Sequence, residues 1–228
     1  MVVPELPTAG RELFRSDAKA ENGRAYIGGW DLSKGKDPKK AAWWYLEVLE
    51  DDFPWAFAKA NDPNRVIATL ELLGTVISIM VFNYSESSLK RSNCTITGET
   101  DNQGISLAMR KFMSTKWPLS GLLIELSEQL RRRNIELHLD WLPREKNQEA
   151  DAITNQDFSS FSPELQVPIS AKDLQWIILD KAMAWAKQIY DETEEKKLKR
   201  KSEKFVEVEV WKKRKTAAAD RLKANDPW

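Results

Sequence analysis

Short apolar runs that end at turn residues mark the first part of the chain. Residues 12–18, 25–32 and 41–49 each predict a strand, because aromatic, β-branched and other apolar residues fill short segments there. Only short polar turns separate the three runs, which favours an antiparallel meander. Inside the second run, the pair Gly28–Gly29 predicts a bulge or a close approach of another part of the backbone.

Helix and strand signals alternate after the meander. The run IATLELLGTVISIMVF is apolar except for Glu71, and it is short for a membrane span, so it predicts a buried helix. The further elements predicted are that helix over 65–83, a strand over 94–100, helices that begin at Asn102 and at Pro118, a strand over 135–143 and a short helix over 147–155. This order predicts an α/β fold, with a mixed five-stranded sheet made of the meander plus two parallel strands, flanked by helices.

Three segments follow from this pattern. Residues 12–156 are the predicted domain, and 157–190 are predicted to add a C-terminal packing helix that begins near Ser170. Residues 191–228 predict a charged helical tail with 12 basic and 9 acidic side chains. Its basic runs are typical of nuclear-targeting or nucleic-acid-binding patches, but the interleaved acids favour a solvated helix.

Overall composition restricts the cellular setting more than the function. The 228 residues contain 35 basic and 35 acidic side chains, so no net field favours a polyanionic partner. The single cysteine, Cys94, excludes an internal disulfide and fits a reducing compartment. The N-terminal residues lack the apolar run of a signal peptide. We therefore expect an intracellular protein of the cytoplasm or nucleus, neither secreted nor in a membrane.

Four acidic residues carry the candidate chemistry, each in a different predicted element. Asp17 ends the first strand, Glu71 lies one turn into the apolar helix, Asp101 ends the fourth strand, and Asp151 lies one turn into the short helix. If the fold brings these carboxylates together, their repulsion is costly unless cations neutralise it. Hard divalent cations prefer oxygen ligands, and two of them can promote phosphodiester cleavage.

Several segments resemble the ribonuclease H domain of retroelement reverse transcriptases, in particular divergent members from tyrosine-recombinase-type and protist retroelements. WLPREKNQEADAITN (141–155) is similar to the family's W-x-P-R-x-x-N-x-x-A-D signature. TDNQG (100–104), SDAKAENGRAYIGGW (16–30) and LELLG (70–74) are similar to its T-D-N segment, first hairpin and glutamate-bearing helix. The similarity extends over roughly residues 12–156, and the element order is that of the family.

The resemblance implies a ribonuclease H-like fold and a metal-dependent endonuclease that hydrolyses RNA in RNA·DNA hybrids. Asp17, Glu71, Asp101 and Asp151 would hold two Mg²⁺ ions, with Mn²⁺ as a substitute. A reverse transcriptase polymerase domain would be a partner, since the chain has no Tyr-x-Asp-Asp motif of its own. The residues that the resemblance places in contact with nucleic acid are Asn102, Gln103, Arg144 and Asn147, the last also a candidate helix N-cap.

A departure from the family keeps other functions open. No histidine lies in the loop before the last helix, and His138 belongs to a strand. A catalytically inactive, domesticated domain that binds nucleic acid or a protein partner is therefore the alternative. A 3′–5′ exonuclease or a transposase of the same fold is a third possibility, which the signature before the last helix disfavours. The aromatic run Trp43–Trp44–Tyr45 predicts core packing rather than base stacking.

Overall fold

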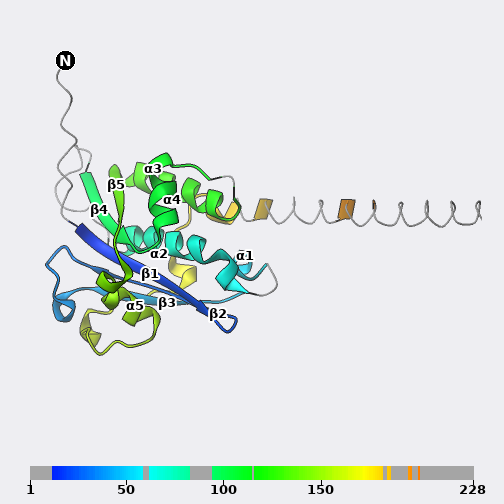
Figure 1. Cartoon of the computed structure of the whole chain (residues 1–228). Helices are drawn as coiled ribbons and strands as arrows, with labels where there is room; N and C mark the ends of the chain where they lie inside the picture. Colours follow the sequence, from blue (N-terminus) through cyan, green and yellow to red (C-terminus); the bar gives the residue numbers. More distant parts are fainter. Residues whose placement is uncertain are drawn as a thin grey trace, which may run out of the picture. The chain divides into compact units, whose positions relative to one another are not determined.

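The computed structural model describes residues 12–58, 62–82, 94–114, 116–181, 184–185, 195–196 and 200. The chain divides into two compact units, Met1–Asp180 and Lys181–Trp228. In the second unit, the described residues are helical, and the rest of the predicted tail lies outside the described part. The strands and helices of the first unit, shown in Figure 1, are β1 (Glu12–Glu21), β2 (Arg24–Asp31), β3 (Trp43–Val48), α1 (Pro54–Phe57), α2 (Ile67–Phe82), β4 (Cys94–Thr100), α3 (Gln103–Lys111), α4 (Leu119–Arg133), β5 (Ile135–Trp141) and α5 (Gln148–Thr154).

The five strands form one mixed sheet in the order β3-β2-β1-β4-β5. β1, β2 and β3 pair antiparallel, β4 lies parallel to β1, and β5 lies parallel to β4. The predicted fold, a ribonuclease H-like sheet made of a meander plus two parallel strands with flanking helices, is confirmed by this topology.

The first hairpin is longer than predicted. β1 continues to Glu21, and the turn to β2 consists of Asn22 and Gly23, whose φ angles are 53° and 74°. An Asn-Gly pair with positive φ at both positions gives a tight turn that matches the twist of the two strands. The prediction that Asp17 ends a strand is therefore wrong: Asp17 lies inside β1, opposite Gly28 of β2.

The two glycines of β2 let helices approach both faces of the sheet. A Cβ added to Gly28 would lie 2.3 Å from Cγ2 of Ile153 in α5, and one added to Gly29 would lie 2.8 Å from Oγ of Ser78 in α2. Because successive residues of a strand face opposite sides, α2 and α5 cover opposite faces. The close approach predicted for the backbone is made instead by helix side chains, and β2 pairs with both neighbours without the predicted bulge.

Replacing Gly28 with alanine is expected to destabilise the protein by about 1–3 kcal/mol, because the new methyl group overpacks the α5 contact. Urea unfolding measures the loss. Truncation of Ile153 to alanine removes the clashing Cγ2 atom, so the double variant should be more stable than the sum of the two single losses predicts. Additive losses would contradict the contact as the cause.

α2 is the central helix of the core. Eleven of its 16 residues are buried, on all sides of the helix, and it contacts β1, β2 and α4. Together with the preceding turn it is long and apolar enough to cross a membrane, yet 67% of its most apolar window is buried in the fold, as in the core helix of a globular domain. Trp43 and Trp44 are also buried, at 2% and 0% exposure, as predicted.

The helix predicted from Ser170 begins later. Ser170 instead precedes a 3-10 turn, Ala171–Asp173, and Leu174 is extended. Helical residues begin at Leu179. The cause lies in another helix: the carboxylate of Glu125 in α4 accepts the backbone N–H groups of Ile177, Ile178 and Leu179 at 2.8–3.2 Å. Those N–H groups point at Glu125, so they are not bonded within a helical turn. The proposed division at residues 156 and 190 stays a prediction.

Candidate functional site

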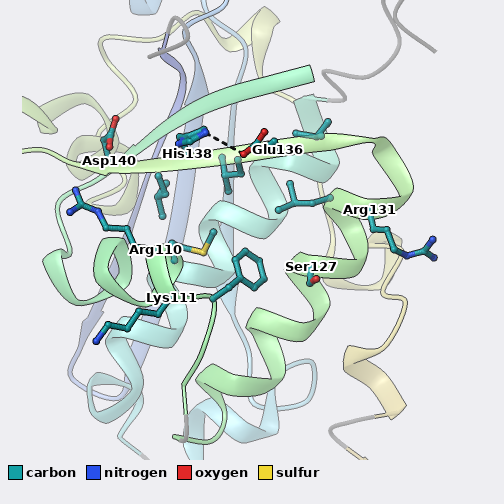
Figure 2. Close-up of a pocket in the computed structure, with 13 residues that line it drawn as sticks. Arg110, Lys111, Ser127, Arg131, Glu136, His138 and Asp140 are labelled. Atoms are coloured by element: carbon teal, nitrogen blue, oxygen red, sulfur yellow. Dashed lines mark ion pairs between the residues drawn. The ribbon is translucent and has the colours of Figure 1, made fainter. Parts of the chain in front are cut away.

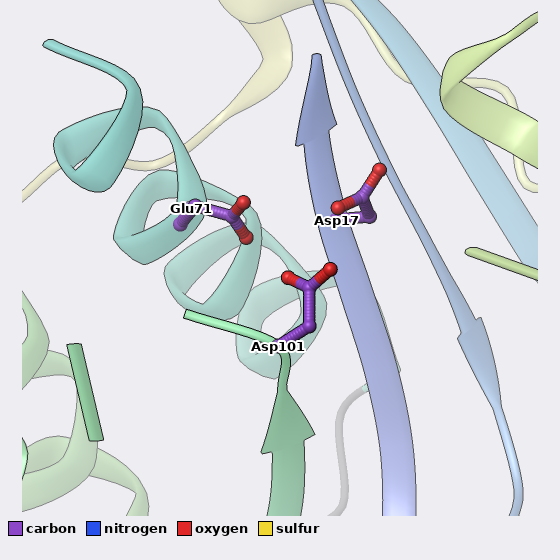
Figure 3. Close-up of side chains that lie close together, drawn as sticks. All are labelled: Asp17, Glu71 and Asp101. Carbon is purple, nitrogen blue, oxygen red and sulfur yellow. The ribbon is translucent and has the colours of Figure 1, made fainter. Parts of the chain in front are cut away.

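Three of the four predicted carboxylates meet at one place. Asp17, Glu71 and Asp101 each offer an oxygen, and these oxygens lie within 4.8 Å of one another (Figure 3). The parallel pairing of β1 and β4 aligns Arg15 with Glu99. The same register continued by two residues brings Asp17 level with Asp101, which directly follows β4.

α2 brings the third carboxylate to this pair. Glu71 lies in the second turn of α2, on the face that packs against β1. One turn later, Gly74 allows the helix to lie close to the strand, since an added Cβ would be 3.3 Å from the Cβ of Ser16. Asp17 and Glu71 are each 5% exposed and Asp101 is partly exposed, so the cluster is buried on the side of α2 and β1 and reaches water at Asp101.

Burial and neighbouring negative charges disfavour the charged forms of all three acids. Burial raises the pKa of Asp17 to about 7. The hydrogen bond from Thr154 lowers this pKa, whereas the negative charges of Asp101 and Asp151 raise it further. Burial and the charges of Asp17 and Asp101 raise the pKa of Glu71 well above its usual range. Burial also raises the pKa of Asp101, against the opposing effect of Arg144. Without added positive charge, the cluster therefore holds protons near neutral pH.

One oxygen of the cluster is left without a partner. Oε2 of Glu71 is buried and accepts no hydrogen bond from any residue that the structure describes. An unsatisfied buried carboxylate oxygen costs free energy, which a bound cation recovers. Three converging carboxylates with a free acceptor form the oxygen-donor set that Mg²⁺ or Mn²⁺ prefers, so the residues fit a divalent cation.

α5 holds Asp17 in place through a residue that the sequence did not suggest. The hydroxyl of Thr154 donates a hydrogen bond of 2.6 Å to Oδ2 of Asp17. Thr154 is 1% exposed, at the last turn of α5, and no sequence pattern distinguishes it from an ordinary helix residue. Its bond leaves the other oxygen of Asp17 available to the cluster.

Asp151 is not part of the three-carboxylate cluster. Its Oδ1 forms an ion pair of 2.9 Å with Nη2 of Arg144, and its Oδ2 accepts a 2.8 Å hydrogen bond from Asn155. It lies near enough to contribute to the raised pKa values of Asp17 and Asp101. Its role as a fourth ligand stays a prediction.

The four predicted contact residues differ in availability. Gln103 is exposed at the start of α3, and Arg144 has a side-chain exposure of 76%. Asn102 is partly exposed and caps α3 by accepting the N–H of Ile105 at 3.2 Å. Asn147 is 0% exposed, so direct contact with a ligand is contradicted. Its side chain does not cap α5 either but donates to the backbone oxygen of Ser16.

An ion-pair network anchors the segment before α5. Arg15 of β1 pairs with Glu12 and Glu99 and donates to the backbone oxygen of Lys146. Burial tends to raise the pKa of Glu12, yet hydrogen bonds with Glu99, Arg15 and Lys36 hold it at about 2. Burial and the Glu12 carboxylate raise the pKa of Glu99 to about 7. The network ties β1 and β4 to the loop that carries Arg144.

A separate groove of about 740 Å³ lies between β5, α3 and the end of α4 (Figure 2). Basic and acidic residues both line it, namely Arg110, Lys111, Arg131, Glu136 and Asp140, and His138 lies 3.6 Å from Glu136. None of its lining residues belongs to the carboxylate cluster. His138 is therefore a surface residue of this groove.

Metal-free protein is expected to lose stability as the pH rises from about 4 to 7. The folded state keeps the proton of Asp17 up to about pH 7, whereas the unfolded chain releases it near the ordinary value of 3.8. In that window the folded state binds more protons, so the free energy of unfolding falls, by about 1.4 kcal/mol per pH unit at most for this group. Glu99 acts in the same direction, so the comparison with Asp17→Asn isolates the cluster. Urea unfolding in EDTA at several pH values should give a flatter profile for the variant, and equal profiles would contradict the proton assignment.

Comparison with known proteins gives structural neighbours only. No protein-family model matches the chain, and no curated protein matches it. The ribonuclease H1 named LC11, isolated from compost by a metagenomic approach, is 19% identical in a crystal structure with an RNA/DNA hybrid, with 64% of this chain and 95% of that chain covered and a TM-score of 0.47. Ribonuclease H1 of Halobacterium salinarum is 14% identical, with coverages of 64% and 96% and a TM-score of 0.42. The N-terminal ribonuclease H domain of a Mycobacterium tuberculosis protein is 11% identical, with coverages of 64% and 92% and a TM-score of 0.38. We therefore infer function from the residues of this chain.

Proposed function

We propose that this protein is a metal-dependent endonuclease that hydrolyses the RNA strand of RNA·DNA hybrids. The observation that carries the proposal is the buried cluster of Asp17, Glu71 and Asp101, with the unpartnered Oε2 of Glu71. Burial disfavours the charged forms of these three carboxylates, and a surface that only binds nucleic acid gains nothing from them. A cation site requires such oxygen ligands, and the bound cation neutralises them.

The residues of the site divide the work between holding cations and admitting substrate. Asp17, Glu71 and Asp101 would hold Mg²⁺, with Mn²⁺ as a substitute, and Asp151 would complete a second ion's site. Bound cations would supply Lewis-acid activation of water and stabilisation of the leaving oxygen at a phosphodiester. Thr154 fixes the orientation of Asp17. Arg144 forms an ion pair with Asp151, which would open when Asp151 binds the second cation. Arg144 is exposed enough to move to a substrate phosphate.

The substrate class and the origin follow from the sequence motifs. WLPREKNQEADAITN (141–155) and TDNQG (100–104) are similar to the ribonuclease H domain of retroelement reverse transcriptases. We therefore propose derivation from such a retroelement, with a polymerase domain as a partner.

The direct test is cleavage of a fluorescent RNA·DNA hybrid by the purified chain. We expect internal cuts in the RNA strand with Mg²⁺ or Mn²⁺, none with EDTA, and little cleavage of single-stranded RNA or of duplex DNA. Cleavage that is unaffected by EDTA would overturn the metal assignment, and preferential cleavage of duplex DNA would overturn the substrate.

A domesticated domain that binds without cutting is the second candidate. The observation in its favour is that both oxygens of Asp151 are already engaged, by Arg144 and Asn155. Hybrid binding without cleavage, in the presence of saturating Mn²⁺, would favour this candidate over the nuclease.

A further inference from the structure

Trp141 is a half-exposed aromatic residue directly beside the carboxylate cluster. It is the last residue of β5, where it pairs with Thr100 of β4, and it is 48% exposed. Its indole Nε1–H donates a hydrogen bond of 2.9 Å to the backbone oxygen of Asp101. The ring therefore contacts the backbone of a residue whose carboxylate belongs to the cluster, and it is partly open to solvent.

Two interactions hold the segment at Asp101 from the side of β5. The indole bond fixes the backbone oxygen of Asp101, and the N–H of Leu142 donates to the backbone oxygen of Thr100 at 3.0 Å. Asp101 directly follows the last residue of β4, so the strand ladder no longer constrains it. The indole bond restrains the backbone at Asp101, from which the carboxylate projects.

The exposed part of the Trp141 ring is an apolar surface that a ligand could bury. Large aromatic side chains gain free energy when they are buried, and the core of this protein buries Trp30, Trp43 and Trp44 almost completely. Trp141 instead keeps about half its surface in water beside Asp101. Exposed aromatic side chains bind nucleic acids at the face of an unstacked base, worth about 1–3 kcal/mol per base. In a duplex the base faces are covered by their neighbours, so the surface left for the ring is the apolar face of a sugar or of a base that has left the stack.

We propose that Trp141 positions both partners of the reaction. Its indole N–H holds Asp101 in its metal-binding orientation, and its exposed ring receives the apolar face of the nucleotide next to the scissile phosphate. This inference rests on the proposed function, because it assigns a nucleic-acid strand to the cluster.

Two substitutions separate the two roles. Trp141→Phe keeps an aromatic face but removes the N–H donor, whereas Trp141→Ala removes both. Trp117→Phe is the matched control, because Trp117 is 40% exposed but lies in the connection between α3 and α4. Thermal unfolding of each variant shows whether the fold is kept.

Binding is measured by fluorescence anisotropy with a labelled RNA·DNA hybrid. Ca²⁺ replaces Mg²⁺, so that the measurement reports binding and does not depend on cleavage. We expect Trp141→Ala to weaken binding roughly fivefold or more. Trp141→Phe should stay within about twofold of the wild type, because one stacking face is retained. A hybrid with an abasic site opposite the ring distinguishes contact with a base, which the abasic site abolishes, from contact with a sugar, which it leaves. Wild-type affinity of a folded Trp141→Ala variant would overturn the ring contact.

Metal binding tests the role of the N–H group. Titration calorimetry of Mn²⁺ into the protein alone should show weaker binding to Trp141→Phe than to the wild type and to Trp117→Phe. If cleavage occurs, kcat of Trp141→Phe should fall while KM changes little. Unchanged Mn²⁺ affinity in Trp141→Phe would overturn the positioning role.

Failure of the two proposals can be told apart. A wild-type protein that binds the hybrid through Trp141 but does not cut it contradicts the nuclease and supports the ring contact. If the wild type cuts the hybrid and Trp141→Ala binds it as tightly as the wild type does, the nuclease is supported and the ring contact is contradicted.

Discussion

Asp101→Asn is expected to reduce Mg²⁺-dependent cleavage of an RNA·DNA hybrid by roughly a thousandfold or more, a loss of about 4 kcal/mol in transition-state stabilisation. The amide replaces one of three carboxylates that converge within 4.8 Å, so it removes a negative charge where the proposed cations would bind. The fold should be kept, since Asp101 is partly exposed and its removal relieves repulsion on Asp17 and Glu71.

Hybrid cleavage rates with Mg²⁺, together with a thermal melt in EDTA, measure both effects. Asp140→Asn serves as the control, because Asp140 is an exposed acid of β5 that lies outside the cluster. Full activity of Asp101→Asn would rule out the carboxylate cluster as the metal site.

Glu125→Ala is expected to lower the free energy of unfolding by about 3–5 kcal/mol, because it leaves several buried polar groups without partners. Glu125 is 0% exposed, and its carboxylate accepts the N–H groups of Ile177, Ile178 and Leu179 as well as the side-chain amide of Gln129. Residues 177–179 would lose the hydrogen bonds that hold them against α4.

Urea unfolding, with Glu128→Ala as the control, measures the effect. Glu128 is three residues further along the same helix, but its ion pairs with Arg131 and Arg132 lie at the surface, so its loss should change the midpoint little. Glu125→Gln keeps a neutral acceptor and should fall between the other two variants. Equal midpoints for Glu125→Ala and Glu128→Ala would contradict the buried anchor.

Local patterns predicted most of the fold. The strand Cys94–Thr100 was predicted to the residue, and the helices α2 to α5 lie where apolar spacing and caps placed them. The helix predicted from Ser170 was wrong because the N–H groups that should have continued it bond to Glu125, about fifty residues earlier in the chain. Bonds between distant segments leave no periodic signal in a sequence.

The site was predictable to the extent that strands and helices positioned it. Asp17, Glu71 and Asp101 meet because the register of β1 and β4 and the packing of α2 follow from the fold. Asn147 occupies the predicted N-cap position of α5, but its buried side chain donates to β1 and not to the helix, a contact between distant segments that the sequence does not reveal. The positioning contacts of Thr154 and Trp141 went unrecognised, because a threonine in a helix and a tryptophan in a strand are common there.

The clustered carboxylates are brought together only in the folded chain. Asp17, Glu71 and Asp101 belong to β1, α2 and the end of β4, so an unfolded chain scatters them. A divalent cation that binds them would select the native state, adding about 2.7 kcal/mol to the free energy of unfolding at a hundredfold excess over its Kd. The free cation concentration would then help set how much of the protein is folded, and chelation during purification would lower its melting temperature.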